Sequence, residues 1–124
     1  MLASKQREVI AVVDDDPVML QALDDLLSSL GYRAELYGSA TEFIAAALTT
    51  DAACLLLDIQ LGDMTGIELA HHLTSTGLSF PTIFMTASDD GMFRRDAVAA
   101  GCVEYLRKPF PAERLVSAIA KAIG

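Results

Sequence analysis

Short apolar runs alternate five times with longer amphipathic stretches along the 124 residues of the chain. This alternation is typical of βαβ units built around a parallel sheet. The runs at 9–14, 54–58 and 81–86 are apolar without alternation, as expected for strands covered by helices on both faces. The pattern therefore predicts an α/β fold with strands at 9–14, 33–37, 54–58, 81–86 and 104–107, the first, third and fourth being central.

Capping signals place helices between these strands. Asp16 followed by Pro17 is typical of an N-cap and a first-turn proline, and Gly31 is expected to stop the helix that they open. A leucine stripe at helical spacing lies between them: Leu20, Leu23, Leu27 and Leu30. Two capping-box pairs are expected to open the second and third helices: Ser39 with Glu42, and Thr65 with Glu68. The last helix is predicted to start near Pro111.

Composition narrows the class of protein. The chain is 52% hydrophobic and 21% charged, which fits one compact domain of residues 1–124 in the cytoplasm. Its apolar runs are far shorter than the roughly 18 residues of a membrane span. The formal charge of −8 disfavours binding of nucleic acid by this chain. Cys54 and Cys102 lack the spacing of metal ligands or of a disulfide scaffold, so we expect reduced residues in or near the core.

Charged and polar side chains stand at the far ends of separate apolar runs: Asp14 and Asp15 after VIAVV, Asp58 after CLLL, Thr86 after TIFM, and Lys108 after VEYLR. Parallel strands all point the same way, so these ends are expected to meet at one edge of the sheet, where α/β folds bind ligands. Two carboxylates about 5 Å apart repel by about 3 kcal/mol at an effective dielectric of about 20, so a cation should occupy the cluster. Mg²⁺ and Lys108 are the candidates.

The same residues suit phosphoryl transfer. Aspartate can accept a phosphoryl group, because the transfer mainly requires in-line positioning and cations that neutralise charge on the transferring oxygens. Asp58 is followed by a loop with two glycines, which can bend closely around a ligand. The Thr86 hydroxyl can donate to one phosphoryl oxygen, and the Lys108 ammonium can pair with another. Taken singly, each residue is more often a solvated turn, a strand end or a surface lysine.

In combination, these motifs resemble the receiver domain of two-component response regulators, of the chemotaxis-regulator type. The matching segments are VVDDDP with Asp14 and Asp15, LLLDIQLGDMTG with Asp58 and Gly66, MTAS with Thr86, Gly101 before the last strand, and RKPF with Lys108. The resemblance runs from about residue 9 to residue 123. It implies a three-layer, doubly wound, flavodoxin-like sheet of five strands in the order 2-1-3-4-5, with helices on both faces.

The resemblance also implies a role for each site residue. Asp58 would take a phosphoryl group from the phosphohistidine of a histidine kinase or a histidine phosphotransfer protein. Mg²⁺ would be ligated by Asp15, Asp58 and the backbone carbonyl of Gln60, while Asp14 would act through bound water. The chain would then be a signalling switch rather than an enzyme, with chemistry limited to its own phosphorylation and dephosphorylation.

The resemblance further implies how the switch works. Lys108 would pair with the phosphoryl group, Thr86 would shift towards it, and Tyr105 would move inward with Thr86. These movements would remodel the face formed by the fourth helix, the last strand and the last helix. Gln60 and Ser88 match positions that tune dephosphorylation.

One position departs from the family pattern. Many receivers have a proline four residues after the phosphoacceptor, where this chain has Gly62. The extra backbone freedom of glycine leads us to expect an altered metal affinity or acyl-phosphate lifetime.

Three other features carry alternatives. Arg94, Arg95 and Arg107 form a basic cluster on the expected output face, which is either solvated surface or a contact for a homodimer or effector. His71 and His72 point in different directions on the third helix and do not make a metal pair.

Two other functions stay open. One is a phosphorylation-independent pseudo-receiver. The other is a small phosphatase of the haloacid-dehalogenase type, which Asp14 and Asp16 suggest but which Pro17 and the lack of a cap domain disfavour.

Overall fold

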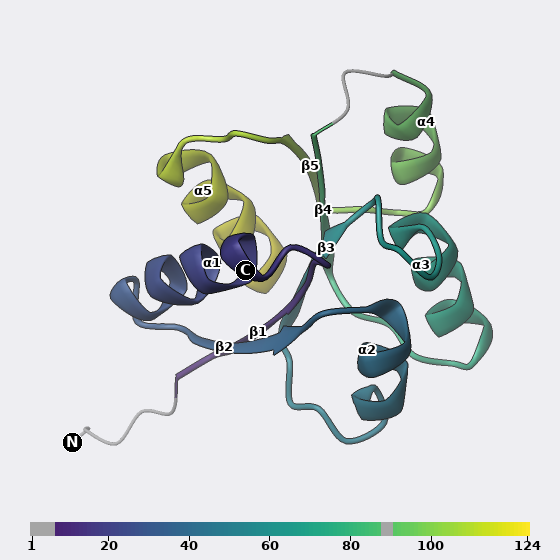
Figure 1. Cartoon of the computed structure of the whole chain (residues 1–124), viewed down its shortest axis with the longest axis horizontal. Helices are drawn as coiled ribbons and strands as arrows, with labels where there is room; N and C mark the ends of the chain where they lie inside the picture. Colours follow the sequence, from purple (N-terminus) through teal and green to yellow (C-terminus); the bar gives the residue numbers. More distant parts are fainter. Residues whose placement is uncertain (1–6, 88–90) are drawn as a thin grey trace.

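The computed structural model describes residues 7–87 and 91–124, and shows one parallel sheet between two layers of helices (Figure 1). Its strands are β1 (Val9–Val13), β2 (Arg33–Tyr37), β3 (Cys54–Asp58), β4 (Thr82–Thr86) and β5 (Glu104–Arg107). Its helices are α1 (Pro17–Ser29), α2 (Ala40–Ala46), α3 (Gly66–Ser75), α4 (Gly91–Ala99) and α5 (Ala112–Ile123). The strands are ordered β2-β1-β3-β4-β5. The predicted α/β fold, its strand order and its three central strands are confirmed.

The central strands send alternate side chains into two cores. Val13, Leu57 and Phe84 pack with α2 and α3 on one face, whereas Val12 and Leu56 pack with α1 and α5 on the other. Figure 1 shows α1 and α5 on one side of the sheet and α2, α3 and α4 on the opposite side. Burial on both faces explains why these three strands have no polar alternation.

The helix starts follow most of the predicted capping signals. Asp16 caps α1 by accepting the backbone N–H of Val18 at 3.0 Å, with Pro17 in the first turn. A complete capping box between Thr65 and Glu68 opens α3. The last helix has its N-cap at Pro111, as predicted.

One of the two predicted capping boxes was wrong. Ser39 caps α2 by accepting the N–H of Glu42, but the Glu42 carboxylate accepts from Gly38 rather than from Ser39, so the box is only half formed. The leucine stripe ends at Leu30, the C-cap of α1, which is 39% exposed, and Gly31 follows with φ +91°, as predicted for the residue that stops this helix.

The remaining sequence expectations concern isolated residues. Cys54 is buried, Cys102 is half-buried, and both are free thiols, as expected. His71 and His72 are exposed on α3. Across the described part of the chain, every helix is too short or too polar to cross a bilayer.

Candidate functional site

Four strands of the sheet deliver polar side chains to its carboxyl edge. Asp14 directly follows β1, Asp58 and Thr86 are the last residues of β3 and β4, and Lys108 directly follows β5. The Lys108 N–H donates to the carbonyl of Thr86 at 2.7 Å, which continues the pairing of β4 with β5. Asp14 and Thr86 are fully buried, and Asp58 is 5% exposed. The parallel sheet therefore assembles in space residues that are up to 94 positions apart in sequence.

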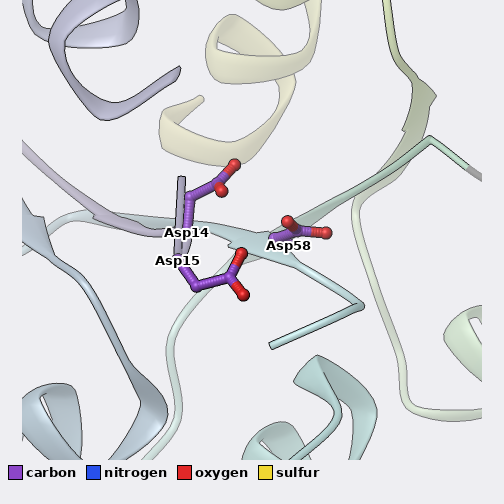
Figure 2. A group of neighbouring side chains, drawn as sticks. All are labelled: Asp14, Asp15 and Asp58. Carbon is purple, nitrogen blue, oxygen red and sulfur yellow. The ribbon is translucent and has the colours of Figure 1, made fainter. Parts of the chain in front are cut away.

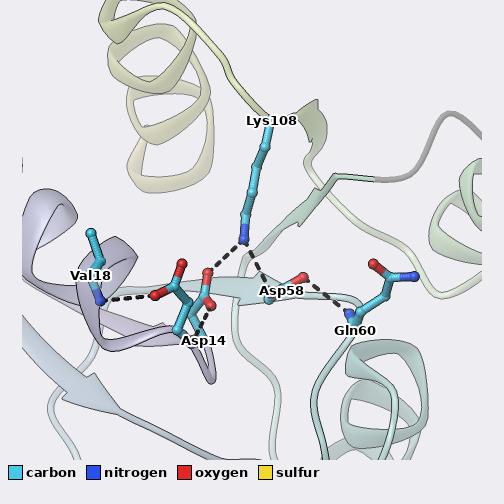
Figure 3. A network of polar contacts seen from close by, with 6 residues as sticks. Asp14, Val18, Asp58, Gln60 and Lys108 are labelled. Atoms are coloured by element: carbon cyan, nitrogen blue, oxygen red, sulfur yellow. Dashed lines mark hydrogen bonds and ion pairs between the residues drawn. The ribbon is translucent and has the colours of Figure 1, made fainter.

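An ion network of two buried carboxylates and a half-buried lysine joins three of these residues (Figure 3). Lys108 Nζ lies 2.7 Å from Oδ2 of Asp14 and 3.1 Å from Oδ2 of Asp58. The second oxygen of Asp14 accepts the N–H of Asp16 at 2.9 Å, and the second oxygen of Asp58 accepts the N–H of Gln60 at 3.1 Å. Each carboxylate is thus held at both oxygens, in a fixed orientation.

The electrostatics of the network depend on burial and on charge pairing. Burial raises the pKa of Asp58, and the Gln60 N–H and the Lys108 ammonium offset this only in part. Burial alone would lower the pKa of Lys108, but its bonds to Asp14 and Asp58 outweigh that effect and raise it. Lys108 is therefore a cation at neutral pH and supplies the positive charge that the buried carboxylates need.

A third carboxylate completes a group suited to a metal ion. Asp14, Asp15 and Asp58 each offer an oxygen, and these three atoms lie within 4.8 Å of one another (Figure 2). Asp15 is exposed, so the group opens to solvent on its side. Clustered carboxylate oxygens are the ligands that hard divalent cations such as Mg²⁺ prefer.

The loop after Asp58 is folded tightly against the site. Gln60 forms an isolated antiparallel bridge with Thr65, and the N–H of Gly66 donates to the carbonyl of Ile59 at 2.7 Å. A Cβ on Gly66 would overlap the carbonyl oxygen of Asp58, so only glycine fits there. Gly66 thus brings the start of α3 against the end of β3.

Asp63 is a feature of this loop that sequence reasoning missed. Its carboxylate accepts the Thr41 hydroxyl at 2.7 Å, the Thr41 N–H at 2.9 Å and the Ala40 N–H at 3.3 Å. The bonds from the Thr41 hydroxyl and N–H lower the pKa of Asp63 to about 2. No local signal identifies these partners, because they precede Asp63 by 22 and 23 positions.

The other predicted residues lie farther along the same edge or on the expected output face. Tyr105 is half-buried on β5, and the Arg94 guanidinium carbon lies 5.6 Å from the centre of its ring, in cation–π range. Arg95 on α4 and Arg107 on β5 are exposed. Ser88 lies outside the described residues.

Comparison with known proteins identifies the class. The family of response regulator receiver domains matches residues 10–120, and the chain belongs to this family. The predicted membership in two-component signalling is thereby confirmed. Receiver domains typically use Mg²⁺, and the three aspartates form an acidic cluster in which it could bind.

Individual relatives agree with this assignment. The chain is 35% identical to the response regulator TmoT of Ectopseudomonas mendocina, over 95% of this chain and 54% of that protein. It is 33% identical to the transcriptional regulatory protein FixJ of Bradyrhizobium diazoefficiens, over 92% of this chain and 56% of that protein. The chain thus spans about half the length of these curated relatives.

Solved structures show the same fold. The crystal structure of FixJ-N superposes with a TM-score of 0.89 at 28% identity, covering 96% of this chain and 95% of that one. A receiver domain protein of Methanospirillum hungatei JF-1 superposes with a TM-score of 0.87 at 26% identity, covering 95% and 94% of the two chains.

Proposed function

We propose that Asp58 is the phosphoacceptor of this receiver, and that it takes its phosphoryl group from the phosphohistidine of a histidine kinase or histidine phosphotransfer protein. A carboxylate oxygen of Asp58 attacks the phosphorus, the bond from phosphorus to the imidazole nitrogen breaks, and an acyl phosphate forms. The imidazole leaves with the bonding electron pair. The observation that supports this role best is the fixed Asp58 carboxylate between Lys108 Nζ and the Gln60 N–H.

Mg²⁺ would be held by Asp15, Asp58 and the backbone carbonyl of Gln60, with Asp14 acting through bound water. When bound, the ion neutralises negative charge on the transferring oxygens. The three aspartates fit such an ion because their oxygens already lie together and one of them faces solvent.

The remaining residues respond to the phosphoryl group. Lys108 exchanges a carboxylate partner for a phosphoryl oxygen, and the Thr86 hydroxyl donates to another oxygen. Tyr105 follows Thr86 inward and remodels the surface of α4, β5 and α5. Gln60 and Ser88 flank the water that hydrolyses the acyl phosphate, and so tune the rate of dephosphorylation.

Intact mass tests the acceptor directly. The protein is incubated with acetyl phosphate, with and without Mg²⁺, in parallel with Asp58→Asn. We expect one phosphoryl adduct that requires Mg²⁺ and is absent from the variant. A native protein that stays folded, binds Mg²⁺ and forms no adduct would instead support the phosphorylation-independent binding module.

We propose the signalling switch in preference to the phosphatase alternative. That reading needs the Asp16 carboxylate for chemistry, whereas Asp16 is exposed and caps α1 through the N–H of Val18. Turnover of a generic phosphomonoester would restore this alternative, and we expect none.

The proposal extends to organisation and partners. We propose that residues 1–124 form one receiver domain in the cytoplasm that does not itself bind nucleic acid, consistent with the net charge of −8. The surface of α4, β5 and α5 is proposed to mediate a homodimer or an effector contact through Arg94 and Arg95. Replacing both arginines by alanine should leave phosphoryl uptake intact and weaken self-association on gel filtration. Unchanged self-association of a phosphorylated dimer would contradict this role.

A further inference from the structure

The loop between β3 and α3, residues 59–65, forms one wall of the aspartate cluster. It carries the Gln60 carbonyl, and it passes beside Asp15, since a Cβ added to Gly62 would lie 3.9 Å from Oδ2 of Asp15. The position of this backbone therefore decides whether the Gln60 carbonyl and the Asp15 carboxylate reach a common ion.

The two ends of the loop are held close to β3. The Gln60 N–H bonds to the Asp58 carboxylate, and the Gly66 N–H bonds to the Ile59 carbonyl. At the tip of the loop, Leu61 packs into the core. The next residue, Gly62, is exposed, and glycine has more backbone freedom than any other residue type. A further restraint on the loop would therefore have its largest effect beside this glycine.

Asp63 supplies that restraint from the adjacent position. Its two oxygens accept three hydrogen bonds from the first two residues of α2, at 2.7, 2.9 and 3.3 Å. Hydrogen bonds to an ionised acceptor are about twice as strong as neutral ones. The helix that donates them is itself anchored, because the Phe43 side chain of α2 is fully buried between Tyr37 and Phe80. The loop tip is thus tied to a part of the core outside its own segment.

We infer that Asp63 is a positioning residue for the metal-binding loop: by fixing the tip on α2, it holds the Gln60 carbonyl and Asp15 within reach of one ion despite the glycine at position 62. This inference rests on the proposed function, because it concerns Mg²⁺ affinity at that same site. A loop that is already ordered before the ion binds loses less conformational entropy on binding, so the ion binds more tightly.

Mg²⁺ titration of the unphosphorylated protein, followed by NMR, tests this role without any catalytic readout. We expect Asp63→Ala to weaken Mg²⁺ binding by about tenfold, the low end of the losses seen when a group that orients metal ligands is removed. The matched control is Asp51→Ala, which removes the same charge from an exposed loop at the opposite edge of the sheet. We expect its affinity to stay within about twofold of the native value, because exposed charges beyond a Debye length are largely screened.

Two further variants separate position from charge. Thr41→Val removes the 2.7 Å hydroxyl donor and leaves the Asp63 charge in place, so it should weaken binding in the same direction by a smaller factor. Gly62→Ala restricts the backbone without strain, because Gly62 does not have a positive φ and its new Cβ would lie at van der Waals distance, 3.9 Å, from the Asp15 carboxylate. In the double variant with Asp63→Ala, the Gly62→Ala substitution should restore part of the Mg²⁺ affinity that Asp63→Ala alone loses.

The outcomes are distinguishable. Native protein that binds no Mg²⁺ would overturn the proposed function itself. Native protein that binds Mg²⁺ while Asp63→Ala binds it equally well would overturn only the positioning role. The role would also be overturned if Thr41→Val had no effect and Gly62→Ala gave no rescue, since Asp63 would then act through charge alone.

Discussion

The two edges of the sheet treat charge in opposite ways. At the amino edge, Arg7, Glu8, Arg33 and Asp51 are exposed around an open hollow. At the carboxyl edge, Asp14 and Asp58 are 0% and 5% exposed and share one lysine. A buried charge loses its hydration, which costs free energy. Among the described residues, Asp14 and Asp58 are the buried charged side chains besides the half-buried lysine that they share, and the amino edge joins helices to strands without burying a charge. The carboxyl edge therefore holds a charge arrangement that the fold does not require, as expected of a ligand site.

Glycine is also used differently at the two edges. The turns that lead into β2, β4 and β5 contain glycines with positive φ and nothing close to the missing Cβ: Gly31, Gly77 and Gly101. At the carboxyl edge, Gly66 has no positive φ but faces the Asp58 carbonyl too closely for any side chain. One edge uses glycine to turn the chain, and the other uses it for close packing around the site.

Removal of the shared lysine should have the largest effect on stability. We expect Lys108→Met to lower the free energy of unfolding by about 3 kcal/mol at neutral pH without divalent ions, because two buried carboxylates lose their counter-charge. Urea denaturation measures this loss, and Mg²⁺ should recover part of it. The control is Lys121→Met, whose exposed pair with Glu104 at 3.5 Å should be worth about 0.5 kcal/mol or less. Equal losses in the two variants would mean that the carboxyl edge is electrostatically ordinary.

Crowding at Gly66 should have the next largest effect. Gly66→Ala should cost about 2 kcal/mol, because the new Cβ overlaps the Asp58 backbone and the loop must shift. Phosphoryl uptake should fall with it. A thermal melt of Gly62→Ala provides the comparison, since that variant should keep or slightly raise the melting temperature. A fully stable Gly66→Ala would show that β3 and α3 are less tightly apposed than described.

A glycine at the amino edge should affect stability without affecting chemistry. Gly77→Ala places a side chain at φ +84° and should cost about 1 kcal/mol through backbone strain. Phosphoryl uptake from acetyl phosphate should be unchanged once the protein is folded. Loss of phosphoryl uptake in a folded Gly77→Ala would show that the glycine turns at the amino edge also affect the chemistry at the carboxyl edge.

The smallest effect concerns acid stability at Asp63. Its pKa of about 2 lies below the value of about 3.9 expected in the unfolded chain, so its stabilising contribution is complete above the unfolded value and is lost as pH falls through the folded one. Native protein should therefore exceed Asp63→Asn in urea midpoint at about pH 5, and the difference should shrink as pH falls and disappear below a pH of about 2. Asp58, whose raised pKa acts with the opposite sign, is present in both proteins and does not affect the difference. A gap that grows on acidification would contradict the assigned hydrogen bonds.

Much of this arrangement could be predicted from local sequence. The unbroken apolar runs marked the three central strands, and the Asp16, Thr65 and Pro111 signals marked helix starts because capping depends on neighbours within one turn. The convergence of Asp14, Asp58 and Lys108 followed from strand direction alone. The family roles of these residues came from the resemblance to receiver domains.

The parts that could not be predicted depend on contacts between distant segments. The Glu42 carboxylate bonds to Gly38 instead of Ser39, a choice between two nearby donors that the capping pattern does not distinguish. In the sequence, Asp63 looks like any acidic residue in a loop. The packing of α2 beside the loop brings the Thr41 donors to its carboxylate. The pairing of Lys108 with both aspartates, rather than one, likewise depends on side-chain placement in three dimensions.

Chemical mapping of the phosphoryl group tests the central claim most directly. The protein is phosphorylated with acetyl phosphate and Mg²⁺, the acyl phosphate is reduced with borohydride, and the peptides are sequenced by mass spectrometry. A single conversion of aspartate to homoserine at position 58, absent when Mg²⁺ is omitted, is the predicted result. Conversion at Asp14, Asp15 or Asp63, with Asp58 untouched, would contradict the assignment of Asp58 as the phosphoacceptor.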